Sequence, residues 1–196
     1  MKARIGVLAL QGGVSEHVDM LNSLGCTTVE VRLPEHLADI NGLVIPGGES
    51  TALIKLLLRW NLVSPIRELA GTGIPIWGTC AGSILLSDEI SEKDHIIDQP
   101  SLELVPVRAE RNSFGRQVAS FQEDLVIKGL DQPFPGVFIR APLLYPLSNR
   151  VEVLCTVEEG AVFLKCENIW LSSFHPELTD DTRIHRMFIE EAVIGS

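Results

Sequence analysis

The sequence GIPIWGTCAGSILL (residues 73–86) decides the fold. Its first residues predict a short apolar strand that ends at Trp77, residues 78–82 predict a sharp turn, and the apolar residues that follow predict a helix that ends at Leu86. A strand, a glycine-rich turn and a helix in this order, with Cys80 inside the turn, are typical of a nucleophile elbow in which cysteine replaces serine. The segment therefore predicts an α/β fold that presents a cysteine at the end of a buried strand.

The residues around Cys80 suit a reactive thiol. A nucleophile in a tight turn needs neighbours without bulk, which explains Gly78 and Gly82. The sulfur would stand at a helix N-terminus, where the backbone dipole favours a thiolate, and the Ala81 N–H could face an oxyanion. A buried structural cysteine beside a glycine-rich turn would explain this segment alone equally well.

Strands and helices alternate outward from this turn through the first half of the chain, which predicts a parallel sheet. The expected strands there are 4–10, 27–33 and 42–45, and the expected helices are 14–24, a helix through residue 60 capped by Ser50 or Thr51, and 64–70. The second half predicts strands at 102–108, 125–127, 137–139, 151–157, 161–166 and 169–174 and a helix at 180–192. Residues 87–101 are polar and are expected to form a surface loop. We predict one domain, residues 1–196, with three α/β/α layers and a mainly parallel central sheet extended by antiparallel strands.

Composition excludes several classes of partner. The formal net charge of the 196 residues is −10, and Lys and Arg are scattered, which argues against binding to nucleic acid or an anionic membrane. We find no apolar run long enough for a membrane span, and we interpret the N-terminus as a first strand and not as a signal peptide. The cysteines show no zinc-like spacing. We therefore expect a cytoplasmic protein with reduced thiols.

A second motif near the C-terminus, SSFHPE (residues 172–177), supplies a candidate base. Pro176 favours extended backbone at His175, so His175 and Glu177 should point to the same side. The imidazole could take the thiol proton while the carboxylate fixes its tautomer. The other histidines, His17, His36, His95 and His185, are expected on the surface or on helix faces. A metal site that combines His175 with His185 is conceivable, but spacing does not support it.

The sequence PGGEST (residues 46–51) forms a second glycine-rich loop between a strand and a helix. A phosphate-binding role is disfavoured because the loop lacks the Walker lysine. We expect the Gly48 N–H to complete an oxyanion hole, and Glu49 could meet the ammonium group of a zwitterionic substrate.

Together, PGGEST, GTCAG (78–82) and SFHPEL (173–178) resemble class I glutamine amidotransferases. The segments GVLALQGG (6–13), ERNSFGRQ (110–117) and VFIRAP (137–142) are similar to the glutaminase subunit of pyridoxal 5′-phosphate synthase, the PdxT/SNO family. This resemblance implies hydrolysis of L-glutamine to L-glutamate and ammonia, with Cys80 as nucleophile and His175 and Glu177 as its relay. It also implies that glutamine contacts Gly48, Glu49, Ser50, Arg111, Ile139 and Arg140.

The resemblance further implies a partner, and it implies that the chain needs no cofactor or metal. The glutaminase would dock on a synthase subunit in a large hetero-oligomeric complex, with Gln11 near the interface, and ammonia would pass inside the complex. Docking would complete the oxyanion hole, and we hypothesise a flip of the Gly47–Gly48 peptide, since glycines flip at low cost. Two alternatives remain: a glutaminase or cysteine hydrolase that serves another acceptor, and a non-catalytic scaffold subunit.

Overall fold

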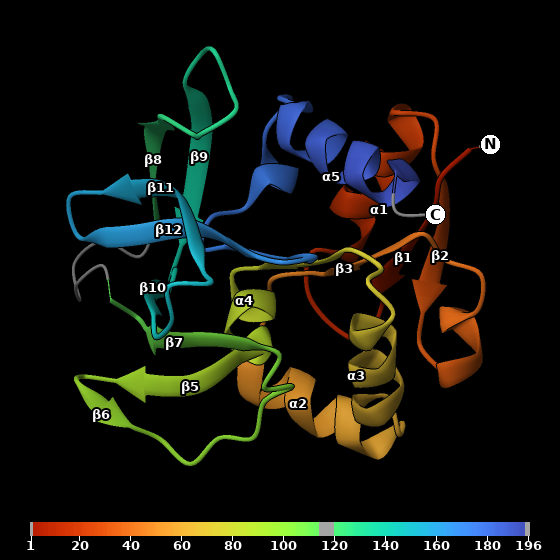
Figure 1. Ribbon diagram of the computed structural model, residues 1–196, viewed down its shortest axis with the longest axis horizontal. Helices are drawn as coiled ribbons and strands as arrows, with labels where there is room; N and C mark the ends of the chain where they lie inside the picture. The colour runs from red at the N-terminus through yellow and green to blue at the C-terminus, as the bar shows by residue number, and fades with distance from the viewer. Residues whose placement is uncertain (1, 114–119, 195–196) are drawn as a thin grey trace.

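A computed structural model describes residues 2–113 and 120–194 of the protein. A seven-stranded sheet in the order β11-β12-β13-β4-β3-β1-β2 forms its centre (Figure 1). The strands of this sheet are β1 (Arg4–Leu8), β2 (Thr27–Val31), β3 (Gly42–Ile45), β4 (Ile76–Thr79), β11 (Glu152–Val157), β12 (Gly160–Cys166) and β13 (Ile169–Ser172). From β2 to β13 neighbouring strands are parallel, and β12 and β11 extend the sheet in antiparallel fashion, as predicted.

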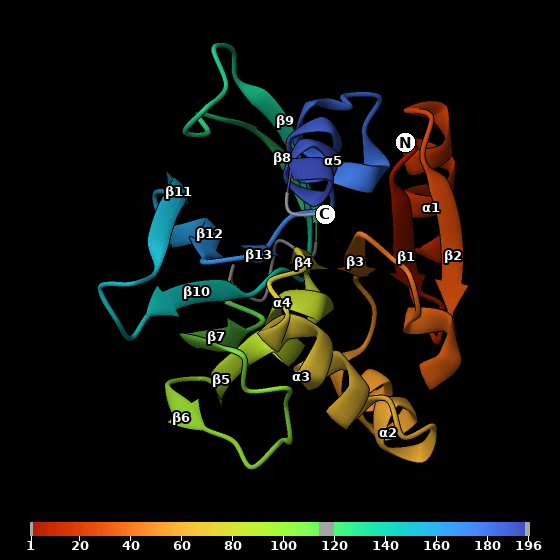
Figure 2. The same cartoon turned by 45° about the vertical axis from the view of Figure 1, so that its right-hand side comes forward.

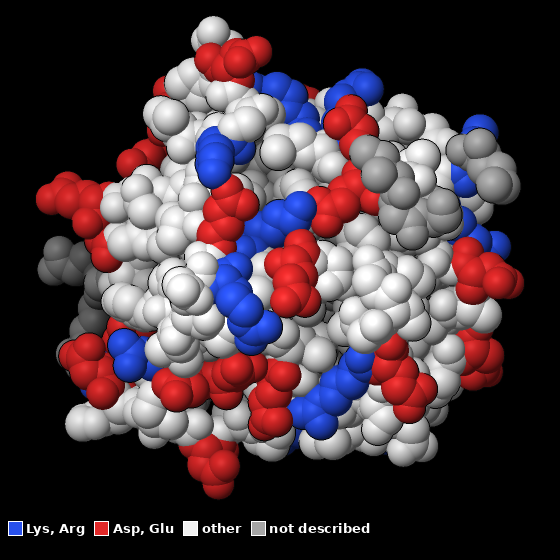
Figure 3. Space-filling view, viewed as in Figure 1, with Lys and Arg blue, Asp and Glu red and all other residues white. Residues whose placement is uncertain are grey.

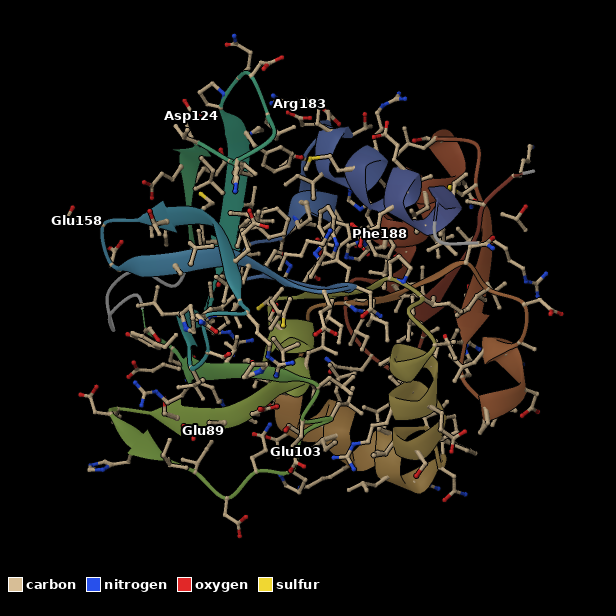
Figure 4. The ribbon with its side chains drawn as sticks, in the orientation of Figure 1. Glu89, Glu103, Asp124, Glu158, Arg183 and Phe188 are labelled. Atoms are coloured by element: carbon tan, nitrogen blue, oxygen red, sulfur yellow. The ribbon has the colours of Figure 1, made fainter. Side chains whose placement is uncertain are left out.

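Helices cover both faces of this sheet, which confirms the three-layer prediction (Figures 1 and 2). The helices are α1 (Val14–Ser23), α2 (Ser50–Arg59), α3 (Val63–Gly71), α4 (Ala81–Leu86) and α5 (Arg183–Ile194), with short 3-10 helices η1 (Pro34–Leu37) and η2 (Pro176–Leu178). One face packs against α1 and α5, where Leu21 and Phe188 are buried, and Phe188 points toward the sheet (Figure 4). The other face packs against α2, α3 and α4 through residues such as Leu53 and Ile66. Burial of these apolar faces provides the main stabilisation of the layers.

The late strands do not all join the central sheet. A second sheet in the order β10-β7-β5-β6 contains β5 (Ser87–Glu92), β6 (His95–Ile96), β7 (Val105–Arg111) and β10 (Leu143–Pro146), and β8 (Ser120–Leu125) pairs with β9 (Phe134–Ile139). The expected surface loop at 87–101 is therefore wrong. Ser87 and Ser91 are buried, and the Ser87 hydroxyl donates to the Ser83 carbonyl while the Ser101 hydroxyl donates to the Ser87 carbonyl. Paired hydroxyls allow a polar segment to lie inside. The strand expected at 125–127 lies earlier, and Val126 is exposed.

The pairing of β4 with β13 positions the candidate site. The two strands are parallel neighbours, with Thr79 opposite Ser172, and the Cys80 N–H donates to the Ser172 carbonyl at 2.7 Å. Both strands therefore end at the same edge of the sheet, one followed by the cysteine turn and the other by the segment of His175. Residues nearly a hundred positions apart in the sequence are brought together in this way.

The surface carries charges of both signs. On the face shown in Figure 3, acidic and basic side chains are interspersed. Among the described helices, none is long and apolar enough to cross a membrane.

Candidate active site

A pocket of about 330 Å³ opens where β4 and β13 end, between the N-termini of α1, α2 and α4. Every site residue predicted from the sequence lines this pocket: Gly48, Glu49, Ser50, Cys80, Ala81, Arg111, Ile139, Arg140, His175 and Glu177. The structure thus brings together a thiol, an imidazole, a carboxylate and two guanidinium groups from distant parts of the chain. Their chemical roles follow from their contacts.

Cys80 lies in a strained elbow at the start of α4. Its φ of 48° is in the left-handed region, which non-glycine residues rarely adopt. The flanking glycines are required sterically, because a Cβ on Gly78 would lie 2.5 Å from the backbone of Gly82, and one on Gly82 would lie 2.0 Å from the Ile45 carbonyl oxygen. Ser83 holds the elbow to the sheet, since its hydroxyl lies 2.8 Å from both the Gly78 and the Ser172 carbonyl oxygens.

His175 and Glu177 form a tightly linked pair. Nδ1 of His175 lies 2.8 Å from Oε1 of Glu177, and the Glu177 side chain is 1% exposed. The two side chains meet as expected, but the predicted reason is only partly right. His175 is not helical, with φ of −107° and ψ of 88°, but Glu177 lies in the 3-10 helix η2, so the turn after Pro176 brings the carboxylate back to the imidazole.

Electrostatics favour the charged forms of this pair. Burial alone would lower the pKa of His175, but hydrogen bonds to Cys80 and Glu177 and their negative charges raise that pKa to about 10. Burial alone would raise the pKa of Glu177, but His17 and His175 outweigh it and lower that pKa. The imidazole can therefore hold a proton beside the sulfur at neutral pH.

Two of the remaining histidines contradict the prediction. His17 of α1 and His185 of α5 are both completely buried behind Glu177, not on the surface. Nε2 of His17 lies 3.3 Å from Glu177 Oε2, and Nδ1 of His17 lies 3.1 Å from His185 Nε2. His95 is exposed and His36 partly exposed, in line with the expectation. The described residues contain no group of three or more His, Cys, Asp and Glu side chains that could hold a metal ion.

Glu49 has a structural task that the sequence interpretation missed. Its carboxylate caps α2 by accepting hydrogen bonds from the Thr51 and Ala52 N–H groups at 3.2 and 2.8 Å, so neither Ser50 nor Thr51 is the cap. The preference of helix N-termini for an acidic group accounts for this. Arg111 lies 3.6 Å from the same carboxylate and donates to Gln99 Oε1 at 3.0 Å.

The Gly47–Gly48 loop packs closely against the start of α1. The Gly13 N–H donates to the Gly47 carbonyl at 3.2 Å, and a Cβ on Gly12 would lie only 1.7 Å from that oxygen. The Gly47 N–H donates to Thr79 Oγ1 at 3.0 Å. Both polar groups of Gly47 are therefore engaged, and a flip of the Gly47–Gly48 peptide would break the hydrogen bond to Gly13.

Several pocket residues had no assigned role in the sequence interpretation. Gln11, placed near an interface by resemblance, lines the pocket and accepts a hydrogen bond from the Glu49 N–H at 2.9 Å. Glu16, Asn112 and Leu178 also line it. Only their proximity to the recognised motifs could have suggested this. Residues 114–117 of the ERNSFGRQ segment lie outside the described residues.

Comparison with known proteins decides the family. The model of the SNO glutamine amidotransferase family matches residues 7–194. The chain belongs to the SNO glutamine amidotransferase family. A pyridoxal 5′-phosphate synthase subunit PdxT from Dehalococcoides mccartyi is 49% identical over 191 residues, which cover 96% of this chain and 97% of that protein. The subunit of the same name from Bacillus velezensis is 49% identical over 188 residues, covering 96% and 94%.

Solved structures agree with this family assignment. The crystal structure of a glutamine amidotransferase that is 45% identical to this SNO family member superposes with a TM-score of 0.90, covering 96% of this chain and 98% of the other. A putative GMP synthase subunit from Thermoplasma acidophilum shares the fold at 17% identity, with a TM-score of 0.69 over 99% and 96% of the two chains.

Proposed function

We propose that this protein is the glutaminase subunit of a pyridoxal 5′-phosphate synthase, which hydrolyses L-glutamine to L-glutamate and ammonia for vitamin B6 synthesis. The observation that carries the proposal is the convergence of Cys80, His175 and Glu177 in one pocket of a chain that belongs to this family. Their order, a thiol at a helix N-terminus, an imidazole and a buried carboxylate, is that of a nucleophile, a base and an orienting group.

The proposed reaction proceeds through a thioester. The Cys80 sulfur attacks the carbon of the γ-carboxamide, and the carbonyl electrons move to an oxygen that the Gly48 and Ala81 N–H groups would stabilise. Collapse of this intermediate breaks the C–N bond while His175 gives a proton to the leaving nitrogen, so ammonia departs. Water, deprotonated by His175, then attacks the thioester to release glutamate and restore the thiol.

The rim of the pocket fits a zwitterionic amino acid. Arg111 and Arg140 offer guanidinium groups for the α-carboxylate, since a planar fork suits a carboxylate. Glu49 is an anion for the ammonium group. Burial alone would raise its pKa, but backbone N–H groups of Ala52 and Thr51, together with Arg111, lower it. Ser50 and Ile139, which also line the pocket, complete the proposed contacts.

The proposed partner is the synthase subunit of the complex, in the cytoplasm. Ammonia that escapes into bulk water is diluted or protonated, so direct transfer from this pocket to the synthase would keep it available for the reaction. The Gly47–Gly48 loop, packed on Gly12 and Gly13 at the N-terminus of α1, is where we propose that docking acts, through the peptide flip.

The test is a glutaminase assay with and without the synthase subunit. We expect activity that depends on the partner and that falls to background in Cys80→Ala, because no other group can form the thioester. Cys166→Ala is the matched control, since Cys166 is buried and lies outside the pocket, and it should keep the activity.

Glutaminase activity that survives in Cys80→Ala would contradict the proposed nucleophile. An inactive wild-type complex would favour the scaffold alternative. Recovery of a different acceptor protein in a pull-down, with no affinity for the synthase, would favour the other glutaminase alternative.

A further inference from the structure

The carboxylate of Glu177 faces a second histidine on the side away from the pocket. Its Oε1 pairs with His175, while Oε2 is buried and, within the described part of the chain, makes no standard hydrogen bond. Nε2 of His17 lies 3.3 Å from that oxygen. His17 and the Glu177 side chain are both almost inaccessible to solvent, with side-chain exposures of 0% and 1%.

His17 is enclosed in a small aromatic and polar box between α1, α5 and β4. The ring of His185 lies behind it, and Trp77 packs edge-on against both rings, at centroid distances of 5.8 and 4.9 Å. The Thr79 hydroxyl, which also accepts from the Gly47 N–H, lies 3.3 Å from His17 Nε2. One buried imidazole therefore touches both the proposed triad and the residue that anchors the glycine loop.

An unpaired atom fixes the tautomers of the two rings. Nδ1 of His185 is buried and has no hydrogen-bond partner in the structure as described. An unpaired N–H there would cost more than an unpaired lone pair, so the proton of His185 belongs on Nε2. That N–H then donates to His17 Nδ1 at 3.1 Å. The proton of His17 then lies on Nε2, which is 3.3 Å from the Thr79 hydroxyl, its hydrogen-bond partner, and also 3.3 Å from Glu177 Oε2.

Both rings are neutral in this arrangement. Burial lowers the pKa of His17, and His175 lowers it further. The carboxylates of Glu177 and Glu16 raise it, but by less. Burial and His17 lower the pKa of His185 to about 3, although Glu177 opposes this. Neutral rings can each carry one proton and accept at the other nitrogen, so a directed chain of donors runs from His185 to Glu177.

We propose that His17 is a positioning residue, which holds the second oxygen of Glu177 through its Nε2–H and so keeps the carboxylate charged and aimed at His175. The chain His185–His17–Glu177–His175–Cys80 is then a single line of polar contacts from the core to the pocket. The inference rests on the proposed function, because it assigns to His17 a role in the proposed triad.

Three substitutions at His17 distinguish a role as hydrogen-bond donor from a role in packing alone. Glutamine places an N–H close to the position of imidazole Nε2, asparagine places one close to Nδ1, and leucine fills the space without a donor. With the synthase present, we expect His17→Gln to keep kcat within about threefold. His17→Asn and His17→Leu should lose about 10- to 100-fold in kcat with little change in KM, the effect of one hydrogen bond to a charged group.

A second measurement reads the thiol without any turnover. The pH profile of Cys80 alkylation by iodoacetamide should move upward by about one unit in His17→Leu and His17→Asn but not in His17→Gln, because a less charged Glu177 stabilises the imidazolium less. Burial raises the pKa values of Cys26, Cys155 and Cys166, so these thiols react little near neutral pH. Cys80→Ser gives the background.

The third measurement uses the wild-type protein alone, so it does not depend on the folding of any variant. Nuclear magnetic resonance of the wild type labelled with ¹⁵N-histidine should show His17 and His185 as neutral rings with the proton on Nε2. A proton on Nδ1 of His17 would overturn the proposal, as would folded His17→Leu and His17→Asn variants with unchanged kcat and alkylation profile. The tautomer is measured without glutaminase activity, so a result that contradicts the role of His17 is distinct from a result that contradicts the proposed function.

Discussion

His175 and His17 lie on opposite sides of the Glu177 carboxylate, and their pKa values are shifted in opposite directions. His175 faces the pocket, where hydrogen bonds to Cys80 and Glu177 overcome its burial and raise its pKa to about 10. His17 faces the core, where burial dominates and lowers its pKa although Glu177 lies 3.3 Å from its ring. The difference is that His175 has hydrogen bonds to both Cys80 and Glu177, whereas His17 shares one carboxylate and contacts a second imidazole.

The comparison shows that burial alone does not set the charge of a histidine. Desolvation disfavours the charged form of both rings, and only the number and sign of the groups within hydrogen-bonding distance separates them. The same carboxylate therefore serves a proton carrier on one side and a neutral donor on the other. Three further predictions test this difference between the two histidines. They change the shared carboxylate, a buried histidine and an exposed histidine in turn.

The largest effect is expected from Glu177→Gln, which removes the shared charge with little change of shape. His175 loses its anionic partner, so its pKa should fall and kcat for glutamine should drop by about 10²–10⁴-fold, as for triads deprived of their carboxylate. The measurement is glutaminase activity with the synthase present, together with a resonance titration of His175. Activity within tenfold of the wild type would show that the charge is not needed.

A smaller effect concerns stability on the core side of the carboxylate. Because the folded-state pKa of His185 is lowered to about 3, its contribution to stability is present above its unfolded value of 6.5 and is lost as the pH falls below 6.5. His175, with a raised pKa, behaves in the opposite way and loses its contribution as the pH rises toward 10. The free energy of unfolding should therefore be greatest near pH 6.5.

His185→Gln tests the acidic side of that maximum. The wild type should lose up to about 2 kcal/mol more of its free energy of unfolding between pH 7 and pH 5 than the variant does. This is the loss expected for a group whose pKa falls from 6.5 in the unfolded state to about 3 in the folded state. Urea unfolding at several pH values measures it. A wild type whose stability does not decline below pH 6.5 would mean that His185 is already protonated in the folded state.

The smallest effect is expected from His95→Gln, a histidine that water surrounds. His95 is exposed on β6, so the substitution should change the free energy of unfolding by less than about 0.5 kcal/mol at both pH 7 and pH 5. It should leave kcat unchanged. A pH-dependent loss of stability in this variant would show that burial is not what distinguishes His185.

The sequence was sufficient for the parts of the site that local rules control. Glycines around Cys80 and the proline after His175 have strong backbone preferences, and apolar strands predict the parallel sheet. The cap of α2 was misassigned because a helix start is uncertain by one residue, and it lies at Glu49 and not at Ser50 or Thr51. Ser87 of β5 was misassigned because the carbonyl that accepts from its hydroxyl, that of Ser83, lies on α4.

The buried histidines show what tertiary structure adds. His17 falls on the same helical stripe as Val14, Val18 and Leu21, so its spacing did indicate a face toward the core. It was expected on the surface or on a helix face, and its burial is tolerable because Thr79, Glu177 and His185, all distant in the sequence, offer polar contacts. A contact between α1 and α5 cannot be predicted from either helix alone, because it depends on how both pack on the sheet.

The interior position of β13 has a consequence for the timing of activity. This strand lies between β12 and β4, and it carries the chain directly into His175 and Glu177 (Figure 2). On the ribosome, the thiol of Cys80 is made long before any of these residues emerges. A growing polypeptide therefore holds the sulfur without the proposed base until β13 has inserted between β12 and β4, and the proposed release of ammonia must wait for that step.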